Sequence, residues 1–150
     1  MIVRDAKRED IPAIVAMLAD DTLGRSRERV EDPLPQPYWD AFAAIEADPN
    51  NRLLIAEIDG AVAACLQLTF VPGMSRLGAK RAQIESVRVA SAYRGAGLGR
   101  KLVEAAIAEA RRHGSTIVQL TTDKARADAR RFYEGLGFVA SHEGMKLRLD

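Results

Sequence analysis

The sequence predicts a single α/β (α+β) domain over residues 1–150. It is expected to hold a mixed, mostly antiparallel twisted sheet of about seven strands, flanked by about four helices. Asp59-Gly60 joins two apolar, strand-like runs, which is typical of an antiparallel hairpin. A helical stripe lies between two further strand-like runs, 82–89 and 116–122, which predicts a right-handed parallel crossover. No linker, internal repeat or low-complexity run divides the chain.

The expected order of elements is β-α-α-β-β-β-α-β-α-β-β, and the first half supplies the first five of them. Residues 2–4 form a short strand, and apolar residues at helical spacing predict a helix over about 10–18. A polar segment, 20–32, and three prolines separate this helix from a second one at 38–47. The hairpin strands follow at 52–58 and 61–71.

The second half begins with the strand 82–89 and a helix whose apolar stripe runs from Leu98 to Ala110. Arg111 and Arg112 occupy its last turn, as the helix dipole favours, and His113-Gly114 closes it. A strand at 116–122, a helix at 125–136 and two short strands at 138–140 and 145–149 complete the expected fold.

Composition excludes several classes of protein. The 22 basic and 21 acidic residues argue against a highly basic nucleic-acid module and against an acidic disordered chain. The single Cys65 cannot form an internal disulfide, and with two separated histidines it predicts no metal site, so it is interpreted as a core residue. No apolar run approaches the roughly 18 residues of a membrane span, and the N-terminus lacks a signal-peptide pattern. We therefore expect no membrane or nucleic-acid partner and a cytoplasmic location.

A glycine-rich turn, Arg94-Gly95-Ala96-Gly97-Leu98-Gly99, lies where a strand meets a helix. Glycine permits positive φ and close approach of a ligand, and the first helical turn carries unpaired N–H groups. This combination predicts a phosphate site, with a ligand-free tight turn as the alternative. A dinucleotide motif would need glycine at Arg100, and a P-loop would need Gly-Lys-Ser/Thr, so neither nucleotide motif fits.

Three motifs resemble those of the GNAT N-acetyltransferases. Arg94-x-x-Gly97-x-Gly99 is similar to the family's pyrophosphate-binding motif, Gln/Arg-x-x-Gly-x-Gly/Ala. The strands at 84–89 and 118–122 fit in order, and Ala129–Phe138 resembles the signature Ala-x-x-Phe/Leu-Tyr-x-x-x-Gly-Phe. These motifs span about half of the chain, while the first half matches only in its pattern of elements. The resemblance implies an acyltransferase that moves acetyl from acetyl-CoA directly to an amine.

The resemblance also implies which residues hold the cofactor. The backbone of Val87 and Val89 would bind the pantetheine arm, and the 94–99 turn would bind the pyrophosphate, helped by Arg94 or Arg100. The full expected set is Val87, Arg88, Val89, Arg94, Gly95, Ala96, Gly97, Leu98, Gly99, Arg100, Arg126 and Phe132. Arg126 departs from the family, because many relatives carry asparagine there. A local excess of basic residues between Arg76 and Lys101 suits an anionic cofactor, or forms a solvated face.

Glu85 and Tyr133 are the expected catalytic pair. In unbroken alternation Glu85 shares a face with Val87 and Val89, where a carboxylate is costly unless paired or functional. It would act as the general base that deprotonates the amine, directly or through water. The alternatives are an ion pair with a nearby cation or a bulge that turns Glu85 to solvent. Tyr133 matches the family's general acid for the leaving thiolate, with a packed tyrosine beside Phe132 as the alternative.

The acceptor is the least constrained feature. Five acidic residues lie between the first two helices, a region that borders the acceptor pocket in this family, so a small and possibly cationic amine is expected: Asp20, Asp21, Glu28, Glu31 and Asp32. A solvated acidic loop is the alternative. The 84–89 and 126–133 segments resemble aminoalkylphosphonate N-acetyltransferases, which favours small amines. A protein lysine or N-terminal acetyltransferase and a non-catalytic acetyl-CoA-binding regulatory module stay open, as does a homodimer.

Overall fold

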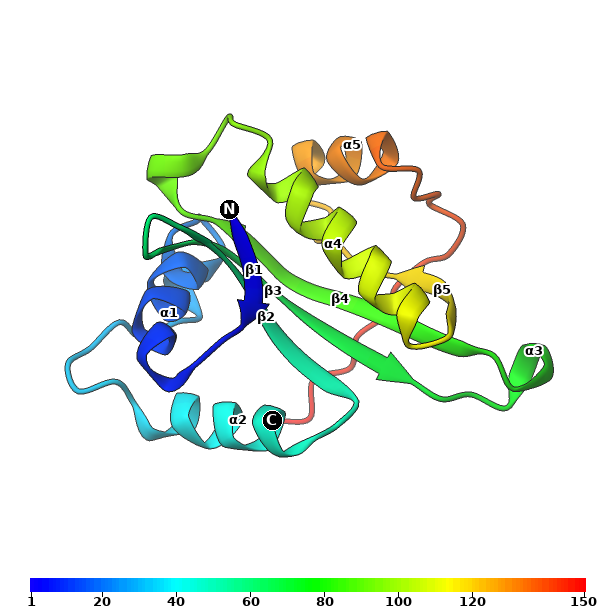
Figure 1. The fold of residues 1–150 in the computed structure, drawn as a ribbon, viewed down its shortest axis with the longest axis horizontal. Helices are drawn as coiled ribbons and strands as arrows, with labels where there is room; N and C mark the ends of the chain where they lie inside the picture. The colour runs from blue at the N-terminus through cyan, green and yellow to red at the C-terminus, as the bar shows by residue number, and fades with distance from the viewer.

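Five strands form one sheet in the computed structural model, which describes residues 1–150 (Figure 1). They lie side by side in chain order: β1 (Ile2–Asp5), β2 (Asn51–Ile58), β3 (Ala61–Val71), β4 (Lys80–Val89) and β5 (Ser115–Gln119). β1 to β4 pair antiparallel, whereas β4 and β5 pair parallel. The mixed sheet and its parallel crossover confirm the predicted fold class.

The hairpin between β2 and β3 is also confirmed. Asp59 and Gly60 both have positive φ, 49° and 79°, which is the backbone of a type I′ turn. This turn sets a register in which Ile58 lies opposite Ala61.

The four predicted helices are present: α1 (Ile11–Ala19), α2 (Gln36–Ala47), α4 (Leu98–Arg112) and α5 (Ala127–Gly135). α2 begins two residues earlier than predicted because Pro37 fits in its first turn, where proline's missing N–H costs nothing. A single turn, α3 (Ser75–Gly78), caps the β3–β4 hairpin, and positive φ at Arg76 and Leu77 makes it left-handed. Short 3₁₀ turns lie at Arg8–Asp10, Gly24–Ser26 and Ser91–Tyr93. None of the helices combines the length and apolar character needed to cross a bilayer.

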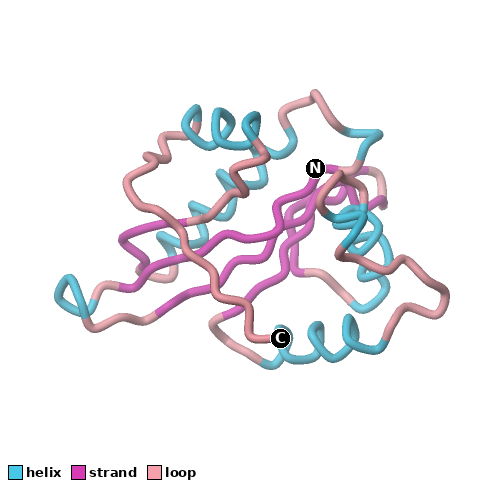
Figure 2. The backbone as a smooth tube through the Cα atoms, turned by 180° about the vertical axis from the view of Figure 1, so that it is seen from behind, coloured by secondary structure: helices cyan, strands magenta, loops and turns pink.

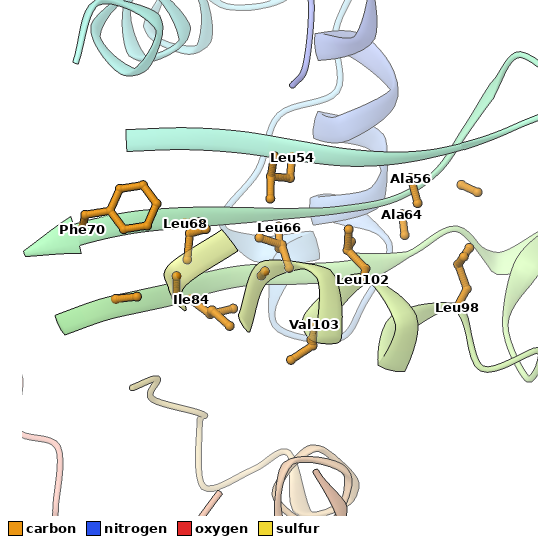
Figure 3. Close-up of a cluster of buried hydrophobic side chains, with 14 residues drawn as sticks. Leu54, Ala56, Ala64, Leu66, Leu68, Phe70, Ile84, Leu98, Leu102 and Val103 are labelled. Carbon is orange, nitrogen blue, oxygen red and sulfur yellow. The ribbon is translucent and has the colours of Figure 1, made fainter. Parts of the chain in front are cut away.

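Helices cover both faces of the sheet. On one face, the apolar stripe of α4 packs on even-numbered residues of β3 and on β4 (Figure 3); examples are Leu102 and Val103 against Leu66, Leu68 and Ile84. On the other face, α1 and α2 pack against Ile55 and Cys65. Burial raises the pKa of the Cys65 thiol to about 12, so this residue is a core thiol, as predicted.

The strands predicted at 138–140 and 145–149 do not form, and β5 ends at Gln119 rather than at residue 122. The sheet therefore has five strands instead of about seven. Figure 1 draws the last segment behind the strands and Figure 2 draws it in front of them, so it passes over one face of the sheet. Residues 142–150 donate no backbone hydrogen bond to the rest of the chain. An alternating pattern does not by itself make a strand, because a strand also needs a sheet edge that its path can reach.

Candidate active site

A β-bulge in β4 sets the geometry of the site. Gln67 of β3 lies opposite Glu85, but Cys65 lies opposite Arg88, so β4 holds one extra residue between these pairs. Ser86, at the bulge, has a φ of 56°, a left-handed conformation that non-glycine residues rarely adopt. Beyond the bulge every side chain of β4 has changed face.

The bulge overturns the predicted orientation of Glu85. Val87 and Val89 join the core on the α4 face together with Ile84, whereas Glu85 lies on the opposite face with Gln67. The side chain of Glu85 is exposed and forms neither an ion pair nor a hydrogen bond with the protein. Glu85 is therefore not a buried carboxylate, and the alternative of a bulge that turns its side chain toward solvent is correct.

β4 and β5 separate beyond their first few residues. Their ladder joins Lys80–Gln83 to Ser115–Gln119 and then ends, so the rest of β4 has no strand on that side. Ala90 donates its N–H toward β3, to Ala63 O, at 2.8 Å. Because successive peptide groups alternate, those of Val87 and Val89 point into the gap left by β5. The two carbonyls accept only side-chain donors, from Arg88 and Arg94 respectively.

The glycine-rich turn leads into α4 beside this gap. Gly95 and Gly97 have φ of 86° and 75°, so both positions use the conformational freedom of glycine. Gly97 is the N-cap of α4 and offers no side-chain acceptor, and the N–H groups of Gly95, Ala96 and Gly97 donate to no backbone oxygen. Together with the first-turn N–H groups of Leu98, Gly99 and Arg100, they form a row of donors at the positive end of the helix.

Gly99 fixes how closely this turn approaches its neighbours. A Cβ placed on Gly99 would lie 3.4 Å from Val89 Cγ2 and 3.7 Å from Phe132 Cζ. The turn, the end of β4 and the Phe132 side chain of α5 therefore meet at Gly99.

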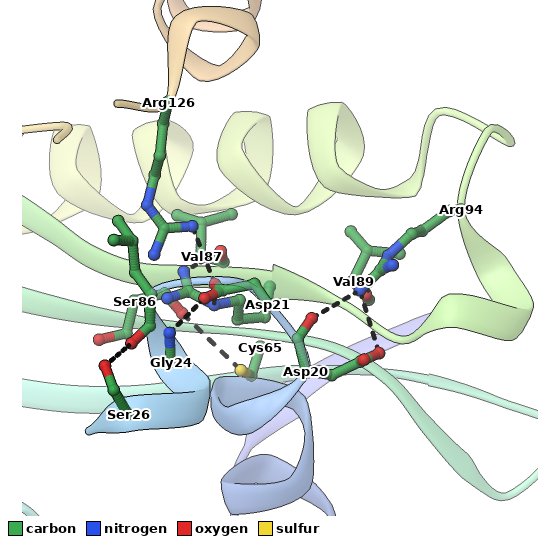
Figure 4. Close-up of polar contacts among 12 residues, drawn as sticks. Asp20, Asp21, Gly24, Ser26, Cys65, Ser86, Val87, Val89, Arg94 and Arg126 are labelled. Carbon is green, nitrogen blue, oxygen red and sulfur yellow. Dashed lines mark hydrogen bonds and ion pairs between the residues drawn. The ribbon is translucent and has the colours of Figure 1, made fainter. Parts of the chain in front are cut away.

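The loop after α1 holds the arginines of the site (Figure 4). Arg94 donates to Val89 O at 3.2 Å and reaches Asp20 Oδ2 at 3.2 Å. Arg126, at the N-cap of α5, donates to Asp21 Oδ2 at 2.9 Å, and Arg88 Nε lies 3.2 Å from the same oxygen. Two adjacent aspartates thus bind three of the arginines predicted to hold the cofactor.

Asp21 is the centre of this network. Burial alone would raise the pKa of its carboxyl, but the Gly24 N–H, the Arg126 hydrogen bond and the positive charge of Arg88 outweigh burial and lower the pKa to about 2. Only 20% of the Asp21 side chain is exposed, so its ion pairs lie in a partly desolvated setting. Asp21 therefore remains an anion throughout the physiological pH range.

Tyr133 lies on α5 between two aromatic neighbours. Its ring centroid is 5.0 Å from that of Phe132 and 5.8 Å from that of Phe138, both in edge-on arrangements. The Tyr133 hydroxyl forms no hydrogen bond with the protein. Burial raises the pKa of this phenol above its ordinary value of 10, and the charges of Arg88 and Arg126 offset only part of the effect. The Tyr133 ring is therefore packed, as the alternative predicted, while its hydroxyl has no bond within the protein and keeps a proton that it can donate.

Most acidic side chains between α1 and α2 already have partners within the protein, whereas the sequence suggested that they would attract a cationic amine. Glu28 accepts the Tyr38 hydroxyl at 2.8 Å, and Glu31 pairs with Arg29. Because Asp20 and Asp21 are also paired with arginines, three of the five carboxylates form ion pairs within the protein and a fourth, Glu28, accepts a hydrogen bond. No three His, Cys, Asp or Glu side chains gather as a metal site requires.

Comparisons with known proteins agree with this geometry. Residues 14–138 match the model of the Acetyltransferase (GNAT) family. The chain belongs to this family. It is 29% identical to the aminoalkylphosphonate N-acetyltransferase of Salmonella typhimurium over 144 residues, which are 93% of this chain and 86% of the relative. The GNAT fold and this relative make the protein an acyltransferase.

Two solved structures extend the comparison. A crystal structure of a transcriptional regulator from Bacillus halodurans C-125 is 50% identical, with a TM-score of 0.96 and 99% of each chain covered. A predicted acetyltransferase from Clostridium acetobutylicum, solved with acetyl-CoA, is 20% identical, with a TM-score of 0.76 and 99% of this chain and 96% of that chain covered. The second likeness concerns the fold alone.

Two features of this GNAT site are not predicted by the sequence patterns. The first is Asp21, which binds both Arg88 and Arg126. It lies 105 residues from Arg126 in the sequence, so no local pattern predicts this contact. The only hint was the arginine at position 126, where many relatives carry asparagine. The second feature is a polar strip on the face that holds Glu85. Asn51 accepts Gln67 Nε2 at 3.0 Å, and Gln119 donates to Gln83 at 3.0 Å.

Proposed function

We propose that the protein transfers acetyl from acetyl-CoA to the primary amine of a small molecule, with Glu85 as general base and Tyr133 as general acid. One arrangement carries the proposal. The row of free N–H groups at the start of α4 and the unpaired edge of β4 border the same gap, and Tyr133 lies on α5 next to Phe132, which packs against the glycine turn.

The backbone groups around the gap suit coenzyme A in the hydrogen bonds that they offer. Free N–H groups from Gly95 to Arg100 are donors for a pyrophosphate, and Gly97 needs no rearrangement to present them. The peptide groups of Val87 and Val89 would bind an amide-bearing arm as an added strand does. Acetyl-CoA supplies the thioester that is attacked. Arg94 and Arg126 are held by Asp20 and Asp21, so they would reach phosphate only by sharing or exchanging these carboxylates.

Glu85 and Tyr133 would handle the two protons that the ammonium of the acceptor loses. Glu85 removes the first, because only the neutral amine can attack the thioester carbon. The C–N bond forms, the C–S bond breaks, and Tyr133 gives its proton to the leaving sulfur. The second amine proton leaves to solvent or to the tyrosinate, so one proton is released overall. The exposed Glu85 can meet an acceptor on the polar face, while the raised pKa of Tyr133 keeps the acid protonated.

The polar strip favours a small polar acceptor. Gln67, Thr69 and Asn51 form one hydrogen-bonded group on the face of Glu85, and their amide and hydroxyl groups can bind a polar substituent. The relative from Salmonella, named for an aminoalkylphosphonate, is in line with such an acceptor. Since most of the acidic loop is internally paired, we assign recognition of the amine to this strip rather than to the loop.

A second candidate is a regulatory module that binds acetyl-CoA without transferring it. The name of the Bacillus halodurans structure, 50% identical to this chain, is the observation that favours it. Such a module would keep the 94–99 turn and have no use for the free groups of Glu85 and Tyr133.

The experiment compares Glu85→Gln and Tyr133→Phe with the native protein in steady-state kinetics and in acetyl-CoA binding by calorimetry. Each substitution is expected to lower kcat by about 100-fold or more while the acetyl-CoA dissociation constant changes little. Glu46→Gln, an exposed carboxylate on α2, is the matched control and should leave both quantities unchanged. Native turnover in the Glu85 variant at every pH would remove Glu85 from the mechanism.

A further inference from the structure

Arg81 of β4 is a half-buried cation without a partner. It forms neither an ion pair nor a hydrogen bond with the protein. The other arginines that form no ion pair are all exposed to solvent: Arg8, Arg25, Arg76 and Arg111. A cation that is partly withdrawn from water is costly unless an anion faces it. Arg81 is therefore suited to bind an anion that the protein itself does not supply.

Arg81 lies on the same face of the sheet as Glu85. The pairing of β3 with β4 is regular from residue 81 to residue 85, so side chains alternate between the two faces there. Ala82 and Ile84 belong to the core on the α4 side, which leaves Arg81, Gln83 and Glu85 on the opposite face. This stretch of β4 therefore presents a cation at one end and an anion at the other.

The separation between Arg81 and Glu85 leaves room for a small molecule. Four residues of a strand span about 13 Å, so the two side chains do not pair with each other. Side chains in a strand lean along its direction, which brings the guanidinium and the carboxylate closer than the backbone spacing. Gln83, between them, is uncharged and accepts a hydrogen bond from Gln119 at 3.0 Å. A ligand with a positive end at Glu85 and a negative end at Arg81 fits this arrangement.

The order of the two charges along β4 matches the proposed reaction. The ladder between β4 and β5 ends at Gln83 and Gln119. Glu85 consequently lies where the two strands have separated, beside the gap assigned to acetyl-CoA, whereas Arg81 lies where they are still paired. An amine that attacks in the gap is at the Glu85 end, and the rest of the acceptor extends along β4 toward Arg81.

We propose, on the basis of the transfer reaction proposed above, that the acceptor is a small zwitterion whose primary amine meets Glu85 and whose anionic group is bound by Arg81. The anion is a carboxylate, sulfonate or phosphonate, because a guanidinium binds such oxyanions through parallel N–H donors. A neutral amine of the same length leaves Arg81 unpaired, and a diamine brings a second cation toward it. Arg81 is thus the residue that selects the substrate.

Steady-state kinetics with acceptors of equal chain length test the proposal. Aminoethylphosphonate, taurine and β-alanine carry an anion, whereas ethanolamine and ethylenediamine carry a neutral and a cationic group at the same place. The best anionic amine is expected to have a kcat/KM at least about 10-fold above that of ethanolamine. Arg81→Gln should lower kcat/KM for the anionic amine by about 10- to 100-fold and leave ethanolamine unchanged, whereas a folding defect would lower both.

Arg111→Gln is the matched control. Arg111 is an exposed, unpaired arginine on α4, so this variant loses the same charge as Arg81→Gln on an element that packs on the other face of the sheet. It should retain the native preference for the anionic amine.

Calorimetric titration of aminoethylphosphonate into the native protein and Arg81→Gln, with coenzyme A present, separates this site from the transfer reaction. Binding that depends on Arg81, without acetylation of any amine, supports the zwitterion site and refutes the proposed transfer. Transfer with equal kcat/KM for ethanolamine and the anionic amines, a preference for ethylenediamine, or an equal loss of all activities in Arg81→Gln overturns the zwitterion site and leaves the transfer standing. Absence of both binding and transfer overturns both.

Discussion

Replacing Asp21 by asparagine tests the network that joins the loop after α1 to β4 and α5. The substitution keeps the size of the side chain but removes the charge that faces Arg88 and Arg126. A pKa of about 2, against an ordinary value of 3.8, corresponds to about 2 kcal/mol of stabilisation of the carboxylate in the folded state. At neutral pH we therefore expect Asp21→Asn to lower the free energy of unfolding by about 2 kcal/mol.

The pH dependence follows from the direction of the shift. Because the folded pKa lies below the unfolded one, the contribution of Asp21 is complete above pH 3.8 and is lost as the pH falls toward 2. Urea denaturation of both proteins at several pH values should show a difference that is constant near neutrality and shrinks in this acidic window.

Asp20→Asn is the matched control one residue away. The Asp20 side chain is 48% exposed in its ion pair with Arg94, and such surface pairs contribute about 0–1 kcal/mol. Two results would refute the role of Asp21 as a buried anchor. One is an equal loss of unfolding free energy in the two variants. The other is a stability difference between Asp21→Asn and the native protein that persists unchanged to about pH 2.

Three other predictions concern the site and the core. Tyr133→Phe should lower kcat while the KM for acetyl-CoA stays near the native value, and native activity should show no loss from tyrosine ionisation up to about pH 9, because the pKa of Tyr133 is raised. Gly97→Ala, at a φ of 75°, should cost about 1–2 kcal/mol in thermal unfolding and weaken acetyl-CoA binding, whereas Gly60→Ala, at a φ of 79° in the distant hairpin, should affect stability alone. Alkylation of Cys65 at about pH 8 should require unfolding, because the thiol is buried with a pKa of about 12; rapid reaction of the native protein would contradict this assignment.

The local patterns predicted most of the fold. Helical spacing located α1, α2 and α4, and Asp59-Gly60 located the hairpin, because each depends on residues within one or two turns of each other. The C-terminal segment is where local patterns mislead. Alternation over 145–149 predicts a strand and none forms, because strand formation depends on the path of the chain after α5.

The sequence likewise predicts only part of the candidate active site. The glycine turn and Tyr133 follow from motifs, and the structure brings the turn, β4 and α5 together at Gly99. The orientation of Glu85 could not be predicted, because one extra residue at Ser86 reverses the face of every later side chain on β4. Likewise, the contact between Asp21 and Arg126 depends on tertiary packing across 105 residues.

Transfer of acetyl to free amines is the most direct test of the proposed function. The native protein is incubated with acetyl-CoA and, separately, with aminophosphonates, polyamines, amino sugars, amino acids and lysine peptides, while free thiol and acetylated product are measured together. We expect one class of small primary amines to give acetylated product and free thiol in equal amounts, with far slower reaction of the peptides. Binding of acetyl-CoA with no thiol released by any amine would contradict the proposed transfer and favour the regulatory module.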